Sequence, residues 1–222
     1  MRAILALVWK DLVIEARTRE LVTAMSLVAF LTVVIMSLAL GPSLSVVADA
    51  APAILWVTVA FAATLGLARS QALERERQAL CALLLAPVDR GTLYLGKCAA
   101  NLLLVLALQG VVLVTCAVVV NADVGRRAAL VAAPFALGAV GFTAAGTLLG
   151  AMTVTTRLRE VLLPILLLPI TLPVILVSLA AISAILRGAG PGVLAGPLGT
   201  LAAFDVVFLV LGMWLFEYVV EE

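Results

Sequence analysis

Long stretches without a charged residue recur along the chain and set its architecture. Five such stretches each reach the roughly 18 apolar residues that a helix needs to cross a bilayer. A sixth stretch contains Asp205 but is otherwise mostly apolar, and a helix of that length satisfies its own backbone hydrogen bonds in lipid. The six predicted spans cover residues 21–40, 52–69, 98–120, 128–152, 161–186 and 198–218. The pattern predicts an all-α integral membrane protein with one transmembrane domain over residues 1–222.

Composition supports a membrane environment. Hydrophobic residues make up 65% of the chain and charged residues 12%, whereas soluble domains average about 45–50% and about 25%. Water is therefore not the main solvent for this chain.

The distribution of lysine and arginine predicts the orientation of the spans. An N-terminus in the cytoplasm places eleven of the fourteen cations inside, which matches the positive-inside rule. With six spans the C-terminus is then also cytoplasmic, as expected for a multi-pass protein of the cytoplasmic (inner) membrane. The inside cations are Arg2, Lys10, Arg17, Arg19, Arg69, Arg75, Arg77, Arg90, Lys97, Arg157 and Arg159, and the outside ones are Arg126, Arg127 and Arg187.

Residues 1–20 form a predicted amphipathic helix ahead of the first span. Its apolar face comprises Leu5, Trp9, Leu12 and Ala16, and the charged residues Lys10, Asp11 and Arg17 point elsewhere. Such a helix suits the membrane interface and contact with lipid. Two alternatives stay open: these residues continue the first span into the cytoplasm, or they begin a signal peptide, although the apolar run is about twice a usual h-region.

The connection between spans two and three, residues 69–97, is much longer than a simple link of about four to six residues. A charged cluster is followed by leucines at helical spacing, and Pro87 ends the helix. We expect a short cytoplasmic coupling helix that docks on a partner. The predicted docking residues are Glu74, Arg75, Glu76, Arg77, Leu80, Leu83 and Leu84.

Within this connection Gly91, Gly96 and Lys97 match the phosphate-loop spacing G-x-x-x-x-G-K. The next residue is Cys98 rather than a serine or threonine that could hold magnesium, and no strand precedes the motif. We interpret it as a chance match. The chain itself is therefore not expected to be an ATPase.

Two predicted spans carry packing or bending signals. Gly146 and Gly150 form a G-x-x-x-G pair in span four, which predicts close helix packing. Pro164, Pro169 and Pro173 in span five each remove a backbone donor, so that span is a possible hinge, or equally a static kink.

Asp205 is an intramembrane charge, since it falls within the sixth predicted span. Counting from residue 198 places it about two turns from the outer end of the helix. An interfacial position facing a groove or partner and a proton or substrate site both remain open.

Candidate ligands for metals or cofactors are scarce. The chain has three cysteines without C-x-x-C spacing and no histidine, so the usual ligands of zinc and haem are missing. We expect no directly bound cofactor, no metal site, and no role in nucleic-acid binding.

Several segments together resemble the CcmB family, the haem exporter protein B of cytochrome c maturation systems. The matching segments are Asp49 to Trp56, Leu83 to Arg90, Tyr94 to Lys97, Leu168 to Pro173 and Phe216 to Glu222. The chain departs from the family pattern at Gln78, where a glycine is usual, and at Cys81, where a glutamate is usual. Any docking contact that needs that carboxylate is therefore in doubt.

The resemblance implies a permease subunit of an ABC-type export complex. It would receive ATP-derived energy from a separate CcmA-like ATPase and work beside CcmC-like and CcmD-like membrane subunits and a CcmE-like haem chaperone. Haem is the possible cargo, although ATP-driven release of the haem-loaded chaperone fits equally well. The residues alone also allow an ABC permease for a drug or lipid, or a membrane assembly scaffold without energy coupling.

Overall fold

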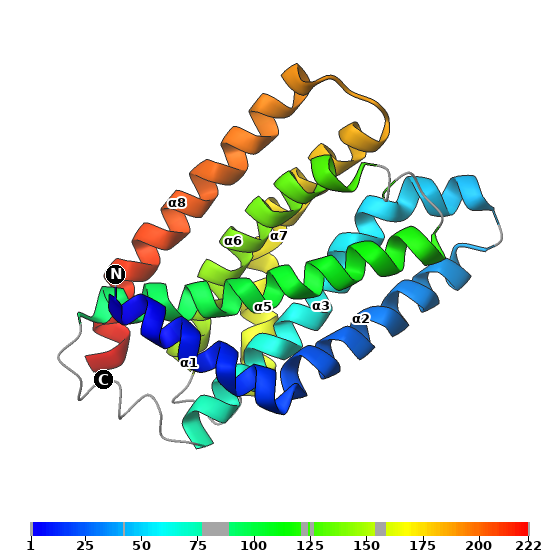
Figure 1. Cartoon of the computed structure of the whole chain (residues 1–222). Helices are drawn as coiled ribbons and strands as arrows, with labels where there is room; N and C mark the ends of the chain where they lie inside the picture. Colours follow the sequence, from blue (N-terminus) through cyan, green and yellow to red (C-terminus); the bar gives the residue numbers. More distant parts are fainter. Residues whose placement is uncertain are drawn as a thin grey trace.

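The computed structural model describes residues 2–41, 43–76, 89–120, 124, 127–153 and 159–221. Over these residues it consists of helices without a strand (Figure 1). The helices are α1 (Arg2–Thr18), α2 (Glu20–Ala39), α3 (Leu44–Glu76), α5 (Arg90–Val119), α6 (Ala128–Thr153), α7 (Arg159–Leu186) and α8 (Pro191–Glu221). Six of them, α2 to α8, are long and apolar enough to cross a membrane. The predicted all-α membrane fold is confirmed.

Helices α3, α5 and α8 are longer than their predicted spans. Residues 69–76 continue α3 and residues 90–97 open α5, so the predicted loop 69–97 was too long at both ends. A count of apolar residues marks only the part that matches the bilayer core, whereas glutamate, arginine, alanine and leucine favour helix beyond it. Helix α8 begins at Pro191 rather than near residue 198, because proline is well suited to the first helical position.

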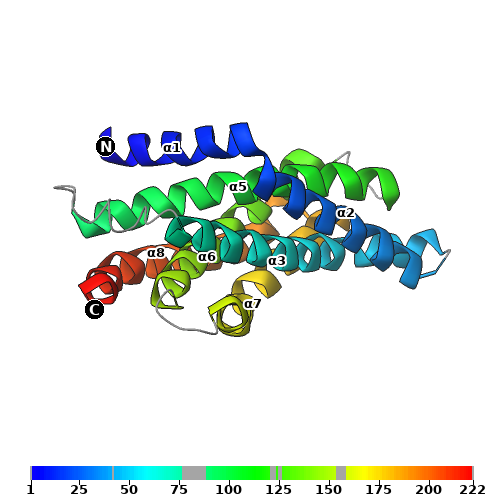
Figure 2. The same cartoon turned by 90° about the horizontal axis from the view of Figure 1, so that it is seen from below.

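A sharp bend at Arg19 separates α1 from α2. Arg19 adopts the left-handed conformation with φ 53°, and α1 turns away from α2 there (Figure 1). The first residues are thus a separate helix and not a straight extension of the first span. Helix α1 packs mainly along α5 (Figure 2), while Leu5 and Trp9 of its apolar face are 64% and 71% exposed.

Both chain termini lie at the same end of the bundle in both views (Figures 1 and 2). We call this the terminal end. Two further exposed aromatic residues, Trp214 and Tyr218, lie in the last turns of α8 at this end, with ring centroids 6.0 Å apart. Tryptophan and tyrosine with exposed rings are typical of the level where a membrane meets water.

Helix α6 is the centre of the bundle and contacts α3, α5, α7 and α8. Every residue from 141 to 150 is buried, so this helix meets protein on all sides. Its glycines leave room for side chains of other helices: Gly138 for Trp56, Gly141 for Asp205, Gly146 for Leu67 and Gly150 for Gln71. Small residues at a helix surface allow such close approach in membrane proteins. The predicted G-x-x-x-G pair therefore faces α3.

Buried polar side chains link the helices around α6. Trp56 of α3 donates a hydrogen bond to Ser178 of α7 at 2.9 Å, and the Ser178 hydroxyl donates to the carbonyl of Pro134 in α6 at 2.7 Å. The Gln109 amide of α5 donates to the Phe135 carbonyl at 2.9 Å. Each such bond in membrane proteins contributes about 0.6 kcal/mol on average, so the set positions the helices more than it stabilises them.

The packing at Gly138 can be tested by filling it. A Cβ at this position would clash with the indole ring of Trp56, so Gly138→Leu is expected to cost about 1–3 kcal/mol or more of stability. The measurement is the thermal unfolding midpoint in mild detergent. Gly110→Leu is the matched control, since nothing lies within 4 Å of a Cβ there. Equal losses for the two variants would contradict the central role of α6.

Candidate functional site

The predicted docking residues begin where α3 projects at the terminal end of the bundle. Glu74, Arg75 and Glu76 belong to the last turn of α3, which ends at Glu76. The other four predicted docking residues, Arg77, Leu80, Leu83 and Leu84, lie outside the described residues. What the structure adds is that the first part of the docking segment continues a membrane-spanning helix without a break.

Helix α5 begins at Arg90, directly after Asp89. The Asp89 carboxylate accepts a hydrogen bond from the backbone N–H of Thr92 at 3.1 Å, which is the usual role of an aspartate at a helix N-cap. This cap fixes the first turn of α5.

The phosphate-loop look-alike lies inside α5. Gly96 packs against Leu7 of α1, where a Cβ would lie 2.7 Å from the Leu7 Cδ1 atom. A phosphate loop needs backbone N–H groups that point freely into a turn, whereas these residues form regular helix. Glycine at position 96 therefore serves the packing of α1 on α5.

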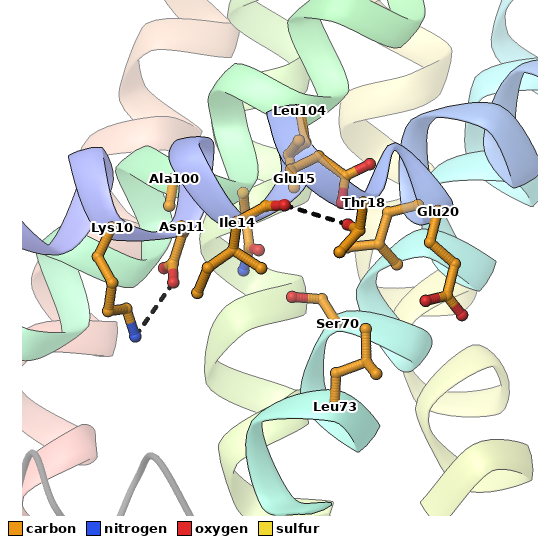
Figure 3. A pocket seen from close by; sticks show the side chains of 12 residues that line it. Lys10, Asp11, Ile14, Glu15, Thr18, Glu20, Ser70, Leu73, Ala100 and Leu104 are labelled. Atoms are coloured by element: carbon orange, nitrogen blue, oxygen red, sulfur yellow. Dashed lines mark hydrogen bonds and ion pairs between the residues drawn. The ribbon is translucent and has the colours of Figure 1, made fainter. Parts of the chain in front are cut away.

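A groove of about 70 Å³ opens between α1, the start of α2, α3 and α5 (Figure 3). Carboxylate, hydroxyl and amide groups alternate with aliphatic side chains along it. The lining residues are Lys10, Asp11, Ile14, Glu15, Thr18, Glu20, Leu21, Ser70, Leu73, Ala100, Asn101 and Leu104. Because Ser70 and Leu73 belong to the projecting part of α3, the groove joins α1 to the helix that carries the first docking residues.

Two carboxylates beside this groove fix the bend between α1 and α2. Glu15 is only 7% exposed, and its Oε1 atom accepts a hydrogen bond from the backbone N–H of Val22 at 2.8 Å. It thereby satisfies a backbone donor that has no partner within the first turn of α2. Its negative charge also interacts favourably with the partial positive charge at this end of the helix. Glu20 pairs with Arg69 of α3 at 2.8 Å, but both side chains are about half exposed and such pairs contribute at most about 1 kcal/mol.

Helix α7 contains all three prolines of the predicted hinge and is helical from Arg159 to Leu186. Its buried stripe includes Leu167, Thr171 and Ser178, whereas Pro169 and Pro173 are exposed on the opposite side. The Thr171 hydroxyl donates to the Leu167 carbonyl at 2.8 Å. Whether the helix moves at Pro164, Pro169 or Pro173 stays a prediction.

Asp205 lies deeper than the sequence indicated. Because α8 begins at Pro191, Asp205 is about four turns from the start of the helix rather than two. It is 6% exposed and lies against Gly141 in the middle of α6. Of the two alternatives that the sequence left open, the interfacial position does not fit the early start of α8, and the role of Asp205 as a proton or substrate site stays a prediction.

Sequence reasoning missed Glu15 and the polar contacts of α5. No sequence pattern singled out Glu15, since its partner is a backbone N–H beyond the bend. The α5 contacts did leave a signal, because Asn101 and Gln109 lie two turns apart within an otherwise apolar span. The Asn101 amide donates to the Thr147 hydroxyl at 3.0 Å. Among the described residues no group of three or more histidine, cysteine, aspartate or glutamate side chains gathers as a metal site would require.

The role of Glu15 gives a prediction for the bend. Glu15→Ala removes the acceptor for Val22 and is expected to cost about 0.5–2 kcal/mol, the range for loss of a helix cap. Glu15→Gln keeps an acceptor oxygen and should lose clearly less. The measurement is thermal unfolding in detergent, combined with amide exchange of residues 20–23. If exchange at Val22 is equal in both variants and the original chain, the carboxylate does not hold the bend.

Comparisons with known proteins cover almost the whole chain. A model of the family described as "CcmB protein" matches residues 2–221. The "Heme exporter protein B" of Bradyrhizobium diazoefficiens is 31% identical over 217 residues, which are 96% of this chain and 94% of that protein. The similarity thus includes all the helices described above.

Proposed function

The chain belongs to the CcmB family, and we propose that it is a membrane subunit of a haem-export complex in cytochrome c maturation. The observation that carries the proposal is the similarity to a haem exporter over 96% of the chain. The six membrane-crossing helices are what a permease subunit requires.

The subunit is proposed to act in the cytoplasmic membrane with both termini in the cytoplasm. The excess of lysine and arginine at one side supports this orientation. The exposed rings of Trp9, Trp214 and Tyr218 support it further, because they would place the terminal end at a membrane surface. Helix α1 would then lie in the cytoplasmic interface with its exposed apolar face in lipid.

Energy would come from a separate CcmA-like ATPase. The segment with phosphate-loop spacing is part of the regular helix α5. Such a helix does not form a phosphate-binding turn, and we therefore assign ATP binding to another chain. The ATPase would dock at the segment that begins with Glu74, Arg75 and Glu76. Helix α3 leads from there to Trp56 in the bundle core without a break, so a push on the docking segment reaches the contacts with α6 and α7. ATP binding must favour one arrangement of these helices over another.

The further partners that we propose are CcmC-like and CcmD-like membrane subunits and a CcmE-like haem chaperone. An ATPase dimer needs two docking sites and one copy of this chain offers one main docking segment, so a second membrane subunit, identical or different, is expected. Haem either crosses the complex or is released from it with the chaperone. A permease for a drug or lipid is the alternative among transporters, and a scaffold without energy coupling is the alternative outside that class.

The partner proposal predicts the composition of the native complex. Affinity purification of the tagged chain in mild detergent, followed by mass spectrometry, should recover an ATPase together with CcmC-like and CcmD-like chains. Recovery with a different set of transport proteins would support another cargo. Recovery without any ATPase would contradict the energy-coupled function.

The coupling proposal predicts an effect of the docking segment on ATP turnover. The triple substitution Glu74→Ala, Glu76→Ala and Leu83→Ala should reduce recovery of the ATPase and lower its activity in the complex at least several-fold. Asp49→Asn, an exposed substitution near the start of α3 at the opposite end of the bundle, is the control and should leave both unchanged. Normal docking and turnover in the triple variant would show that the ATPase binds elsewhere.

A further inference from the structure

Asp205 lies at the middle of the membrane-spanning part of α8, which covers Gly192–Phe216. It faces Gly141, which is likewise near the middle of α6, and a Cβ at Gly141 would lie only 2.7 Å from the Asp205 Oδ1 atom. Both helices therefore place this carboxyl group near the centre of the hydrocarbon layer. The close contact leaves no room for a ligand larger than a proton between Asp205 and α6.

The surroundings of Asp205 are apolar or weakly polar. The side chains of Val174 in α7 and Phe204 in α8 lie 3.4 and 3.1 Å from the same point beside Gly141. Cys98 of α5 lies within electrostatic reach of Asp205, and the nearby Thr143 hydroxyl of α6 donates to the Ala139 carbonyl at 2.7 Å. Within the described part of the chain, the Asp205 Oδ1 atom is buried and makes no hydrogen bond.

No positive charge offsets a carboxylate at this position in the described helices α6 and α7. Neither helix carries a titratable side chain between its ends, and α8 carries none within three turns of Asp205. On α5, Cys98 lies within electrostatic reach of Asp205 and Tyr94 packs against Gly212 of α8, and neither group is a cation. Tyr94 donates its hydroxyl proton to the Ala144 carbonyl at 3.0 Å. Lys97 is the nearest cation along α5, and the ion pairs of the described residues, Lys10 with Asp11 and Arg69 with Glu20, do not include Asp205.

A buried carboxylate without a counter-ion takes up a proton rather than remain charged. An ionised acidic side chain at the centre of a membrane helix is costly unless it is paired or reaches water. We propose that Asp205 is a proton-binding site in the membrane core, and that its carboxyl group is protonated and neutral while α8 is packed against α6.

The proposal has a direct consequence for movement of α8. If α8 separates from α6, water reaches the carboxyl group and the proton can leave it. The packed arrangement then holds one proton more than the separated one, so acid favours packing and alkali favours separation. A conformational cycle that opens this contact would release and take up a proton at Asp205, whatever the cargo.

Infrared spectroscopy of the purified full-length chain in lipid nanodiscs at neutral pH tests the protonation state. The spectrum of the original chain minus that of Asp205→Asn should contain the carbonyl stretch of a protonated carboxylic acid. Asp49→Asn is the matched control, because Asp49 is exposed near the start of α3 and its loss should leave the acid band intact. A difference spectrum with the two carboxylate stretches instead would overturn the proposal.

A second measurement covers the case in which Asp205→Asn fails to fold. Aspartate labelled with carbon-13 at the side-chain carboxyl should shift the acid band of the original chain, without any substitution. An acid band that shifts on labelling supports a protonated aspartate in the core. Absence of any such band would show that Asp205 is ionised, for example because Lys97 approaches it, and would overturn the proposal. The proposed role of the subunit in haem export does not depend on this result.

Discussion

The need to satisfy polar groups inside hydrocarbon governs this structure, and α6 is where that need is met. A bilayer offers no water to buried hydrogen-bond donors and acceptors, so the helices must supply hydrogen-bond partners to one another. Helix α6 is buried on all sides over residues 141–150, and its glycines let Trp56, Asp205 and Gln71 approach its backbone. Ser178 then reaches the Pro134 carbonyl of α6. Larger residues on α6 would hold the other helices apart and separate Trp56, Gln71 and Ser178 from their hydrogen-bond partners.

The terminal end of the bundle follows a different rule, because there water and lipid headgroups can meet polar groups. Helix α3 continues without a break through Glu74, Arg75 and Glu76, the first of the predicted docking residues. The bend at Arg19 lets α1 lie along α5 beside this projection, with Glu15 capping the start of α2. The groove of Figure 3 is the junction of these elements. A force applied to the predicted docking residues would therefore act first on α3. It would reach α1 at the residues that line the groove and α6 where Trp56 packs on Gly138.

This mechanical continuity gives the proposed function a physical form. A permease subunit driven by a separate ATPase, as proposed, needs a stiff connection between the residues that dock the ATPase and the membrane core, and the unbroken helix α3 would provide one. The core also needs an element that differs between two arrangements. The contact of α6 with α8 around Gly141 is suited to this, since it holds a carboxyl group whose environment changes most when the helices part. Pro169 and Pro173 of α7 lie away from the buried stripe, on the side opposite Thr171 and Ser178.

The sequence alone determined the helical membrane fold, the number of spans and the family, because bilayer crossing requires long apolar runs that are visible in any sequence. It also marked Gly146 and Gly150 as packing positions. Only the tertiary structure decided which helices meet: that Gln71 packs on Gly150, that Glu15 caps α2 across a bend, and that Asp205 faces Gly141 at mid-membrane. The length of an apolar run reflects the thickness of the hydrocarbon layer, whereas a helix can continue beyond that layer. The predicted spans for α3 and α8 were therefore shorter than the helices. Partners on separate helices leave no periodic trace in either sequence segment, since each contact depends on how two surfaces fit together.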